Sequence, residues 1–362
     1  MTRTPILITE HFCIDGVALS CVPYGNGHIN GTFLVTVGKH SGAREAYILQ
    51  AINSYVFPEP LKVMENIRRV TEYLRSEISD PRRVLQLVPA KDGGIAYFDR
   101  EGTCWRMYPF IADSICLEAT ENEADFAQCA YAFGEFQKQL IGFPVDQLHE
   151  TLADFHNTPK RYESFLRAVE EDKCGRAASV ADEIAFVKQY EDFCGVLERA
   201  HAAGKLPKRV THNDTKSNNV MLDAQTHKPL CVIDLDTVMP GYSVTDFGDA
   251  IRFGASTAAE DERDLSKVDF DMSLFKAYTR GFLMGCGGLL TAYEIDLLPE
   301  GAKIMTLECG MRFLTDYLQG DVYFKTSYEE HNLVRARTQF KLIRCMEQHW
   351  DEMKAFVNEQ IK

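Results

Sequence analysis

The chain has 362 residues, of which 45% are hydrophobic, enough to bury a large core and to form one two-lobed unit without a further domain. It carries 39 basic and 53 acidic side chains, a formal net charge of −14, so neither nucleic acid nor an anionic membrane is expected as a partner. Eleven cysteines occur without a C-x-x-C pair, which favours reduced thiols over a zinc site or a disulfide framework. Because no apolar stretch resembles a signal sequence or could span a bilayer, we expect a soluble cytoplasmic protein. Nothing in the sequence indicates its oligomeric state.

Residues 1–107 are expected to form a smaller, β-rich lobe. Three glycines, Gly25, Gly27 and Gly31, precede the strand-like run Thr32–Val37. A glycine-rich turn lets backbone N–H groups approach phosphates, so these glycines are candidates for nucleotide binding. Their spacing, G-x-G-x-x-x-G, is one residue longer than in the protein-kinase loop, and hairpin turns also need glycine for their own φ angles.

The next strand and helix differ from a protein kinase in one respect. A third strand is expected over Tyr47–Gln50, and Gln50 stands where a protein kinase would carry its strand lysine. A helix is expected from about Pro60, with Glu65 as the candidate for the usual helix glutamate. Without the lysine, that glutamate lacks its usual ion-pair partner, and we expect phosphate to be anchored in another way.

The two lobes are expected to meet near Trp105–Ile111, a strand-like run that Pro109 stops. A chain crossing there would offer backbone groups to an adenine edge, which makes Tyr108 and Phe110 candidates for cofactor binding. A plain strand end followed by a loop is the alternative. Residues 108–362 are expected to form a larger, mainly helical lobe, with helices over Ala124–Leu140, Val180–His201 and Leu333–Ile361.

The most informative motif is the run Thr211–Asp223, which contains H-x-D-x-x-x-x-N. Phosphoryl transfer needs a carboxylate to orient the attacking hydroxyl, and an amide oxygen and a second carboxylate to bind metal ions. Asp214 is the candidate base, whereas Asn219 and Asp234, which follows a short apolar run, are the candidate metal ligands. The alternative is that these residues form turns through hydrogen bonds to their own backbone.

Three neighbouring features refine this interpretation. Lys216 is a candidate catalytic residue, because its ammonium could offset charge on the transferring phosphoryl group; a solvated loop lysine is the alternative. A hairpin is expected from Asn219 to Asp234. On an extended chain, Asp236 would point the same way as Asp234 and serve as a second metal ligand or a substrate contact.

A literal D-F-G occurs at Asp246–Gly248, 32 residues after Asp214. It follows a polar stretch instead of a buried strand, so we do not expect it to bind metal. Asp246 is instead predicted to cap a helix that runs through Asp249–Arg252, by accepting the free N–H groups at its start.

These motifs resemble the aminoglycoside phosphotransferase superfamily, and the flanking runs resemble its bacterial N-acetylhexosamine 1-kinase branch. The resemblance extends from about Tyr24 to Tyr323. The superfamily likeness lies in Thr211–Asp223, Val232–Gly241 and Asp246–Asp249, and the branch likeness in Tyr47–Asn53, Val56–Phe57, Met64–Ile67 and Phe155–Tyr162.

The resemblance implies a bilobal, protein-kinase-like α+β fold, ATP and Mg²⁺ as cofactors, and a small-molecule sugar as substrate. The product would be the 1-phosphate of N-acetylglucosamine or N-acetylgalactosamine, formed by direct in-line transfer. For some of the implied contacts an ordinary role is the alternative: turn formation, a helix-surface pair or a core phenylalanine. The residues that match the family's sugar contacts are His28, Asn30, Asp214, Asp234, Thr237, Arg312 and Tyr323. Phe253 is a further candidate, because its ring could stack on a sugar face.

Other functions share the same motif. A choline, homoserine or aminoglycoside kinase would keep Asp214, Asn219 and Asp234 but would need an anionic or aromatic cage for a cationic acceptor. A non-catalytic nucleotide-binding pseudokinase is disfavoured because all three residues are present. A protein kinase is disfavoured because the chain lacks the strand lysine, H-R-D and A-P-E.

Overall fold

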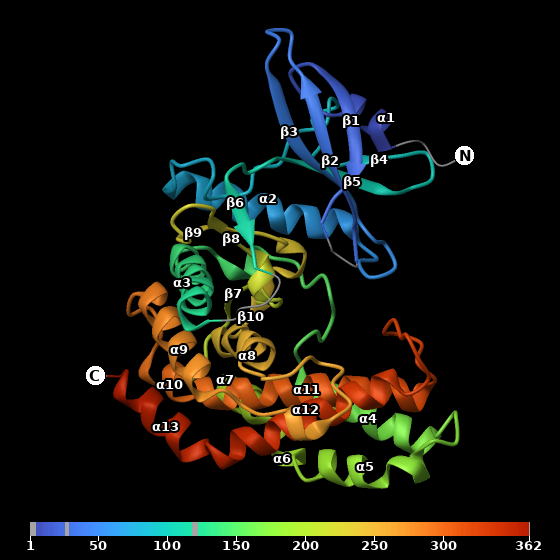
Figure 1. Ribbon diagram of the computed structural model, residues 1–362, viewed down its shortest axis with the longest axis vertical. Helices are drawn as coiled ribbons and strands as arrows, with labels where there is room; N and C mark the ends of the chain where they lie inside the picture. The colour runs from blue at the N-terminus through green and yellow to red at the C-terminus, as the bar shows by residue number, and fades with distance from the viewer. Residues whose placement is uncertain (1–4, 26–28, 118–121, 362) are drawn as a thin grey trace. The chain divides into compact units, whose positions relative to one another are not determined.

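Figure 1 shows the computed structural model, which describes residues 5–25, 29–117 and 122–361. The chain forms two units that are discontinuous in sequence. The first unit consists of Met1–Ile115, Gly142–Ala153 and Met221–Pro240. The second unit consists of Cys116–Ile141, Asp154–Val220 and Gly241–Lys362.

The first unit is built around a five-stranded antiparallel sheet with the strand order β1-β2-β3-β5-β4 (Figure 1). Because side chains alternate between the faces of a strand, Val35 and Val37 enter the core while Thr36 lies on the other face. The strands predicted over Thr32–Val37 and Tyr47–Gln50 are confirmed. The strands are β1 (Val17–Pro23), β2 (Gly31–Gly38), β3 (Arg44–Ala51), β4 (Tyr97–Phe98) and β5 (Cys104–Pro109).

The register between β3 and β5 places two polar residues opposite each other. Leu49 pairs with Met107, and both are fully buried in the core of this unit. The next pair is Gln50 with Arg106, which alternation puts on the other face of the sheet. The lobe boundary expected at residues 107 and 108 falls within β5, and it stays a prediction.

The remaining elements of the first unit include the helix that was predicted from Pro60. This helix, α2, presents one apolar side, and its Asn66 side chain donates to the backbone carbonyls of His149 and Val238 at 2.8 and 3.0 Å. The elements are α1 (Pro5–Ile8), η1 (Thr9–His11), α2 (Pro60–Glu77), η2 (Val145–Gln147) and η5 (Leu235–Thr237), with η denoting a 3₁₀ turn, and the sheet β6-β8-β9 formed by Ser114–Cys116, Val220–Asp223 and Pro229–Val232. Strand β10 (Met239–Gly241) ends this stretch.

The second unit is mainly helical, and its core lies where α11 packs against α4, α8 and α12 (Figure 1). Helix α3 packs along α9. The helices are α3 (Glu123–Gln139), α4 (Thr158–Glu171), α5 (Ala181–Lys188), α6 (Glu191–Cys194), α7 (Val196–Ala202), α8 (Ser243–Gly254), α9 (Met272–Cys286), α10 (Ala292–Asp296), α11 (Leu298–Gln319), α12 (His331–Gln348) and α13 (Trp350–Glu359). Strand β7 (Arg209–Thr211) and the 3₁₀ turns η3 (Ala177–Val180), η4 (Ser217–Asn219) and η6 (Leu265–Lys267) complete it.

Two glycines allow α8 and α11 to cross closely. A Cβ atom at Gly248 of α8 would overlap the backbone carbonyl of Gly301 of α11, and a Cβ at Gly301 would overlap the carbonyl oxygen of Val244. Backbone atoms cannot move aside as a flexible side chain can, so both positions require glycine. This contact fixes α8 against the core.

The predicted helices are confirmed in part. Ala124–Leu140 corresponds to α3. The single helix predicted over Val180–His201 is wrong, because this segment forms α5, α6 and α7, with breaks at Gln189–Tyr190 and at Gly195. The C-terminal helix is likewise divided at His349 into α12 and α13. Across the described residues, every helix is too short or too polar to cross a membrane.

Candidate active site

The catalytic-loop motif brings three of the predicted residues together in the second unit. The Asp214 carboxylate is about a quarter exposed, and the Lys216 ammonium lies 3.2 Å from its Oδ1. The Asn219 amide nitrogen donates to the Asp214 carboxylate at 3.1 Å and to its backbone carbonyl at 2.8 Å. The Asp214 carboxylate is thus held in a fixed orientation, with a cation beside it and part of its surface open to solvent.

Asp246, in the first turns of α8, fixes the backbone that leads into this motif. Its carboxylate accepts hydrogen bonds from the N–H groups of His212 and Asn213 at 2.9 and 2.8 Å, and from the Gln137 amide at 2.9 Å. The predicted helix-cap role of Asp246 is wrong, because these donors lie outside α8. Asn213 has φ 64°, a left-handed conformation that asparagine tolerates better than most residues.

A second carboxylate of α8 acts on the same loop. Asp249 accepts a hydrogen bond from the Thr215 N–H at 3.1 Å and pairs with Arg252 at 3.0 Å. Burial alone would lower the pKa of Lys216, but the carboxylates of Asp214 and Asp249 outweigh it and raise the pKa above its usual range. Lys216 therefore stays protonated and cationic at neutral pH.

His156 contacts the backbone of the catalytic-loop motif, and no role was predicted for it from the sequence. One ring nitrogen lies 2.9 Å from the Glu308 carboxylate, and the other lies 3.3 Å from the carbonyl oxygen of Asn213. Both partners are acceptors, so the geometry suits an imidazolium with two N–H donors. Although burial would lower the pKa of His156, Glu308 raises it. This contact gives the Phe155–Tyr162 run a place in the site.

In the first unit, the predicted metal ligand Asp234 is exposed, at the turn between β9 and η5. It adopts φ 58°, the left-handed region. The expectation that Asp236 points the same way is wrong, because the chain there forms the 3₁₀ turn η5 instead of an extended strand. Asp236 is buried, pairs with the Arg106 guanidinium and accepts a hydrogen bond from the Asn30 amide at 2.7 Å. Thr237, a predicted sugar contact, is also buried.

The glycine-rich loop is tied to this turn through Asn30. Besides donating to Asp236, the Asn30 side chain accepts the Asn53 N–H at 3.0 Å. Gly25 has φ 75°, which favours glycine, and Gly31 begins β2. The predicted residues Gly27 and His28 lie outside the described residues.

Arg106 occupies the region where the strand lysine of a protein kinase was expected. Its Nε donates to the Gln50 side chain at 2.9 Å, and its guanidinium pairs with Asp236. Burial opposes the charge, but Asp236 raises the pKa of Arg106, so it remains a cation. Sequence reasoning missed this residue; the signal is a single charge inside the apolar run Cys104–Tyr108.

The candidate adenine contacts Tyr108 and Phe110 already interact with other groups of the protein. Tyr108 is buried, with the Arg106 guanidinium 5.4 Å from its ring centroid. The Phe110 N–H donates to the carbonyl of Ala46 at 2.9 Å, so that donor is already used. The Phe110 ring meets Tyr24, next to the glycine-rich loop, edge to face at 5.9 Å.

Three predicted sugar contacts, Phe253, Arg312 and Tyr323, lie in α8 or C-terminal to it. Arg312 and Tyr323 lie together. The Arg312 guanidinium, on α11, is 5.9 Å from the Tyr323 ring, 5.8 Å from Phe155 and 5.4 Å from Phe324. Tyr323 is largely exposed. Phe253 is also exposed, with the Arg252 guanidinium 5.6 Å from its ring.

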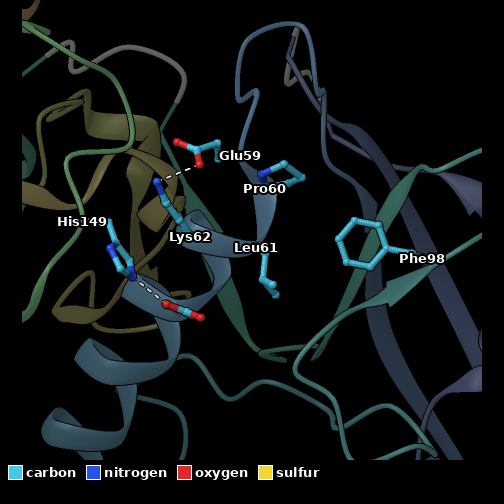
Figure 2. A pocket seen from close by; sticks show the side chains of 7 residues that line it. Glu59, Pro60, Leu61, Lys62, Phe98 and His149 are labelled. Carbon is cyan, nitrogen blue, oxygen red and sulfur yellow. Dashed lines mark hydrogen bonds and ion pairs between the residues drawn. The ribbon is translucent and has the colours of Figure 1, made fainter.

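A cavity of ≈ 500 Å³ lies at the start of α2 (Figure 2). Glu65 contacts His149 there at 2.6 Å and Arg69 at 3.6 Å, which gives the candidate helix glutamate partners other than a strand lysine. No predicted binding residue lines this cavity. Its walls are formed by Glu59, Pro60, Leu61, Lys62, Glu65, Phe98 and His149.

A β-rich unit with a glycine-rich loop, a helical unit with an H-x-D-x-x-x-x-N loop and an acidic turn after β9 together define a protein-kinase-like phosphotransferase. A model of the phosphotransferase enzyme family matches residues 20–278. Since this is more than half of the chain, the protein belongs to that family.

Solved structures of similar fold include three kinases or phosphotransferases. The microcompartment-associated aminopropanol kinase has a TM-score of 0.63 and 15% identity, covering 96% of this chain and 97% of that one. An aminoglycoside phosphotransferase from Alicyclobacillus acidocaldarius has a TM-score of 0.63 and 10% identity, covering 100% and 97%. An amicoumacin kinase in complex with AMP-PNP and Ca²⁺ has a TM-score of 0.58 and 14% identity, covering 94% and 93%. These likenesses confirm the predicted α+β, kinase-like fold.

Proposed function

We propose that this protein is an ATP-dependent kinase that phosphorylates the anomeric hydroxyl of an N-acetylhexosamine, N-acetylglucosamine or N-acetylgalactosamine, to give the sugar 1-phosphate. The observation that carries the kinase assignment is the arrangement around Asp214. Its carboxylate is accessible, oriented by Asn219 and flanked by the Lys216 ammonium at 3.2 Å. Family membership supports the same reaction class.

In the proposed reaction, Asp214 accepts a hydrogen bond from the acceptor hydroxyl and takes its proton as the new O–P bond forms. The ADP oxygen leaves on the opposite side of the phosphorus atom, so the transfer is direct and no phosphoenzyme is formed. Lys216 donates to an oxygen of the transferring group and offsets the charge that develops there. Its raised pKa keeps it cationic for this role.

Asn219 and Asp234 are the proposed Mg²⁺ ligands, and their oxygens are the hard donors that this ion prefers. The Asn219 amide nitrogen is used within the loop, so its oxygen is the atom available for a ligand. When bound, Mg²⁺ would neutralise charge on the nucleotide phosphates. In the part of the chain that the structure describes, no group of three or more His, Cys, Asp or Glu side chains forms a separate metal site.

Arg312 supports a neutral acceptor over a cationic one. It lies among three aromatic rings and interacts electrostatically with Glu308 and His156, which in turn contacts the catalytic loop. A guanidinium there repels a quaternary ammonium or an amino sugar but donates hydrogen bonds to hydroxyl and acetamido oxygens. We therefore assign Arg312 and Tyr323 to the sugar side of the site.

The test is ADP release with Mg·ATP against N-acetylglucosamine, N-acetylgalactosamine, choline, homoserine and kanamycin. The proposal predicts turnover on the two acetylated sugars. Turnover restricted to amine-bearing acceptors would contradict the sugar assignment and keep the kinase assignment. Nucleotide binding without turnover on any acceptor would favour a pseudokinase. Asp234→Ala is expected to weaken Mg·ATP binding as well as turnover.

A further inference from the structure

The buried cation that protein kinases carry on their third strand is missing from β3, and the first unit contains one on the neighbouring strand instead. We propose that Arg106 replaces the strand lysine as the residue that positions the nucleotide-binding parts of this unit. It acts through Asp236 and Gln50 and does not itself contact phosphate. The inference rests on the proposed kinase function and concerns how the chain organises nucleotide binding.

The side chains around Arg106 form a continuous chain of hydrogen bonds and ion pairs. Gln50 lies directly across from Arg106 in the β3–β5 register, and its side-chain oxygen accepts the Arg106 Nε–H at 2.9 Å. The other end of the Gln50 amide donates to the Thr32 hydroxyl at 3.0 Å. The Arg106 guanidinium also pairs with Asp236, whose second oxygen accepts the Asn30 amide at 2.7 Å.

This network joins three segments that the proposed function needs. Asn30 lies at the end of the glycine-rich loop, Thr32 is the second residue of β2, and Asp236 lies two residues after the proposed metal ligand Asp234. Arg106 therefore links the loop and the acidic turn through the buried Asp236 carboxylate and the partly buried side chains of Asn30 and Gln50. A change at this position would shift both at once.

Because Arg106 and Asp236 are both buried, the charge of each must be balanced by the other. Arg106 is 1% exposed and Asp236 is 4% exposed. A buried carboxylate that loses its cation is strongly destabilised, because water cannot replace the lost partner. The turn from Asp234 to Asp236 would then rearrange to hydrate Asp236, and Asp234, in its left-handed conformation, would lose its orientation.

The cation can lie on β3 or on β5, because long side chains at positions 50 and 106 reach the same space. Gln50 and Arg106 are cross-strand neighbours on one face of the sheet, and side chains directly opposite each other have Cβ atoms about 5 Å apart. A lysine at position 50 would carry its ammonium into the space next to the present guanidinium. The network thus predicts that a cation on either strand can balance Asp236.

The experiment compares the wild-type protein with Arg106→Gln, Arg106→Lys and the swap Gln50→Lys/Arg106→Gln. The first readout is the dissociation constant of Mg·AMP-PNP without acceptor, and the second is the KM for ATP against the KM for the acceptor. Arg176→Gln is the matched control, because it removes an arginine ion pair, to Asp321 at 2.6 Å, in the second unit. Thermal melts show whether each variant is folded at the assay temperature.

We expect Arg106→Gln to weaken Mg·AMP-PNP binding by about tenfold or more, the usual scale for a lost charged hydrogen bond, with the acceptor KM nearly unchanged. The swap should recover most of the lost affinity, and Arg176→Gln should bind like the wild type. If Arg106→Gln does not fold, Arg106→Lys and the swap carry the test.

Two results would overturn the inference. One is a folded Arg106→Gln variant with wild-type nucleotide affinity, and the other is a swap that restores the melting temperature without restoring affinity, which would make Arg106 only structural. Failure of the proposed function is distinguishable, because the wild-type protein would then fail to bind Mg·AMP-PNP or to turn over any acceptor.

Discussion

At the scale of single residues, Asp214 is accessible, unlike Asp246 and Asp249, the carboxylates of α8 that contact its loop. Asp246 and Asp249 are buried and engaged with backbone N–H groups, so they shape the loop. Asp214 has a cation and an amide on one side and solvent on the other. That combination suits a proton acceptor more than a structural anchor.

Replacing Asp214 by asparagine tests this distinction. The side chain keeps its size but cannot take a proton, so kcat is expected to fall about 10²–10⁴-fold, the usual contribution of a general base. The dissociation constant of Mg·AMP-PNP should change by no more than about twofold, because the nucleotide is bound by other residues. Turnover of Asp214→Asn close to that of the wild type would show that another group is the base.

His156 gives a pH dependence whose sign follows from its pKa. Glu308 raises the pKa of His156 in the folded protein above its usual value of about 6.5. A histidine with a raised folded pKa contributes stability that is complete below the unfolded pKa and is lost as pH rises through the folded pKa. Asp249 also favours the charged form, whereas Arg312 opposes it.

We therefore expect His156→Gln to cost more unfolding free energy at pH 6 than at pH 9. Chemical denaturation of both proteins at the two pH values measures the difference. Glu308 stays ionised throughout, because His156 overcomes the effect of burial and lowers the pKa of Glu308. An equal cost at both pH values would show that the wild-type imidazole is neutral and that the pair is not ionic.

The residues that the sequence predicted in this loop share one property: they are neighbours along the chain. Asp214, Lys216 and Asn219 were found because their spacing is itself the motif. His156 and Glu308 are 152 positions apart, and Arg106 and Asp236 are 130 apart. Their roles arise from pairing across the fold, and a single sequence carries no signal for that pairing beyond an unusual charge in an apolar strand.

At the scale of elements, α8 places the catalytic loop. Asp246 receives N–H donors from His212, Asn213 and Gln137. Asparagine at position 246 would turn an NH₂ group toward some of these donors. We expect Asp246→Asn to cost about 1–3 kcal/mol of unfolding free energy, the range for unsatisfied buried groups, and to lower kcat.

The matched control is Asp264→Asn, because Asp264 also accepts a backbone N–H, from Ser266 at 3.1 Å, but in an exposed turn. Water can satisfy the groups there, so both stability and kcat should remain near wild type. Equal effects of the two substitutions would mean that Asp246 does not hold the loop.

The crossing of α8 and α11 makes a second prediction at this scale. Gly301→Ala would drive a methyl group against the carbonyl oxygen of Val244, and overpacking of this kind costs about 1–3 kcal/mol. Because α8 carries Asp246 and Asp249, turnover should fall at temperatures where the variant is still folded. Denaturation and kinetics at one temperature measure both effects. Unchanged stability would show that the helices can separate without cost.

Helices and strands were predicted correctly where a local sequence pattern determines them. Helix α2 has proline in its first turn and one apolar side, and strand β2 alternates. The failures lie at short interruptions and turns: Val180–His201 breaks into three helices, and the 3₁₀ turn η5 places Asp236 in the interior. Hydrophobic periodicity does not predict such turns, because they are shorter than the run of residues in which a period can be recognised.

At the scale of the whole molecule, the family match covers some of the proposed acceptor contacts and leaves out others. The family model ends at residue 278, whereas Glu308, Arg312 and Tyr323 lie beyond it. The reaction class is therefore carried by the matched part, whereas the argument for a neutral acceptor rests on Arg312, on α11. Sequence motifs could predict the reaction, but the acceptor depended on a resemblance and on side-chain packing around α11.

The most direct test of the central claim is NMR of the product formed from N-acetylglucosamine, ATP and Mg²⁺. The account predicts a ³¹P signal coupled to the anomeric proton, formed by the wild-type protein and lost with Asp214→Asn. Phosphate on any other hydroxyl would contradict the regiochemistry. No phosphorylated sugar, together with turnover of choline or kanamycin, would contradict the proposed acceptor.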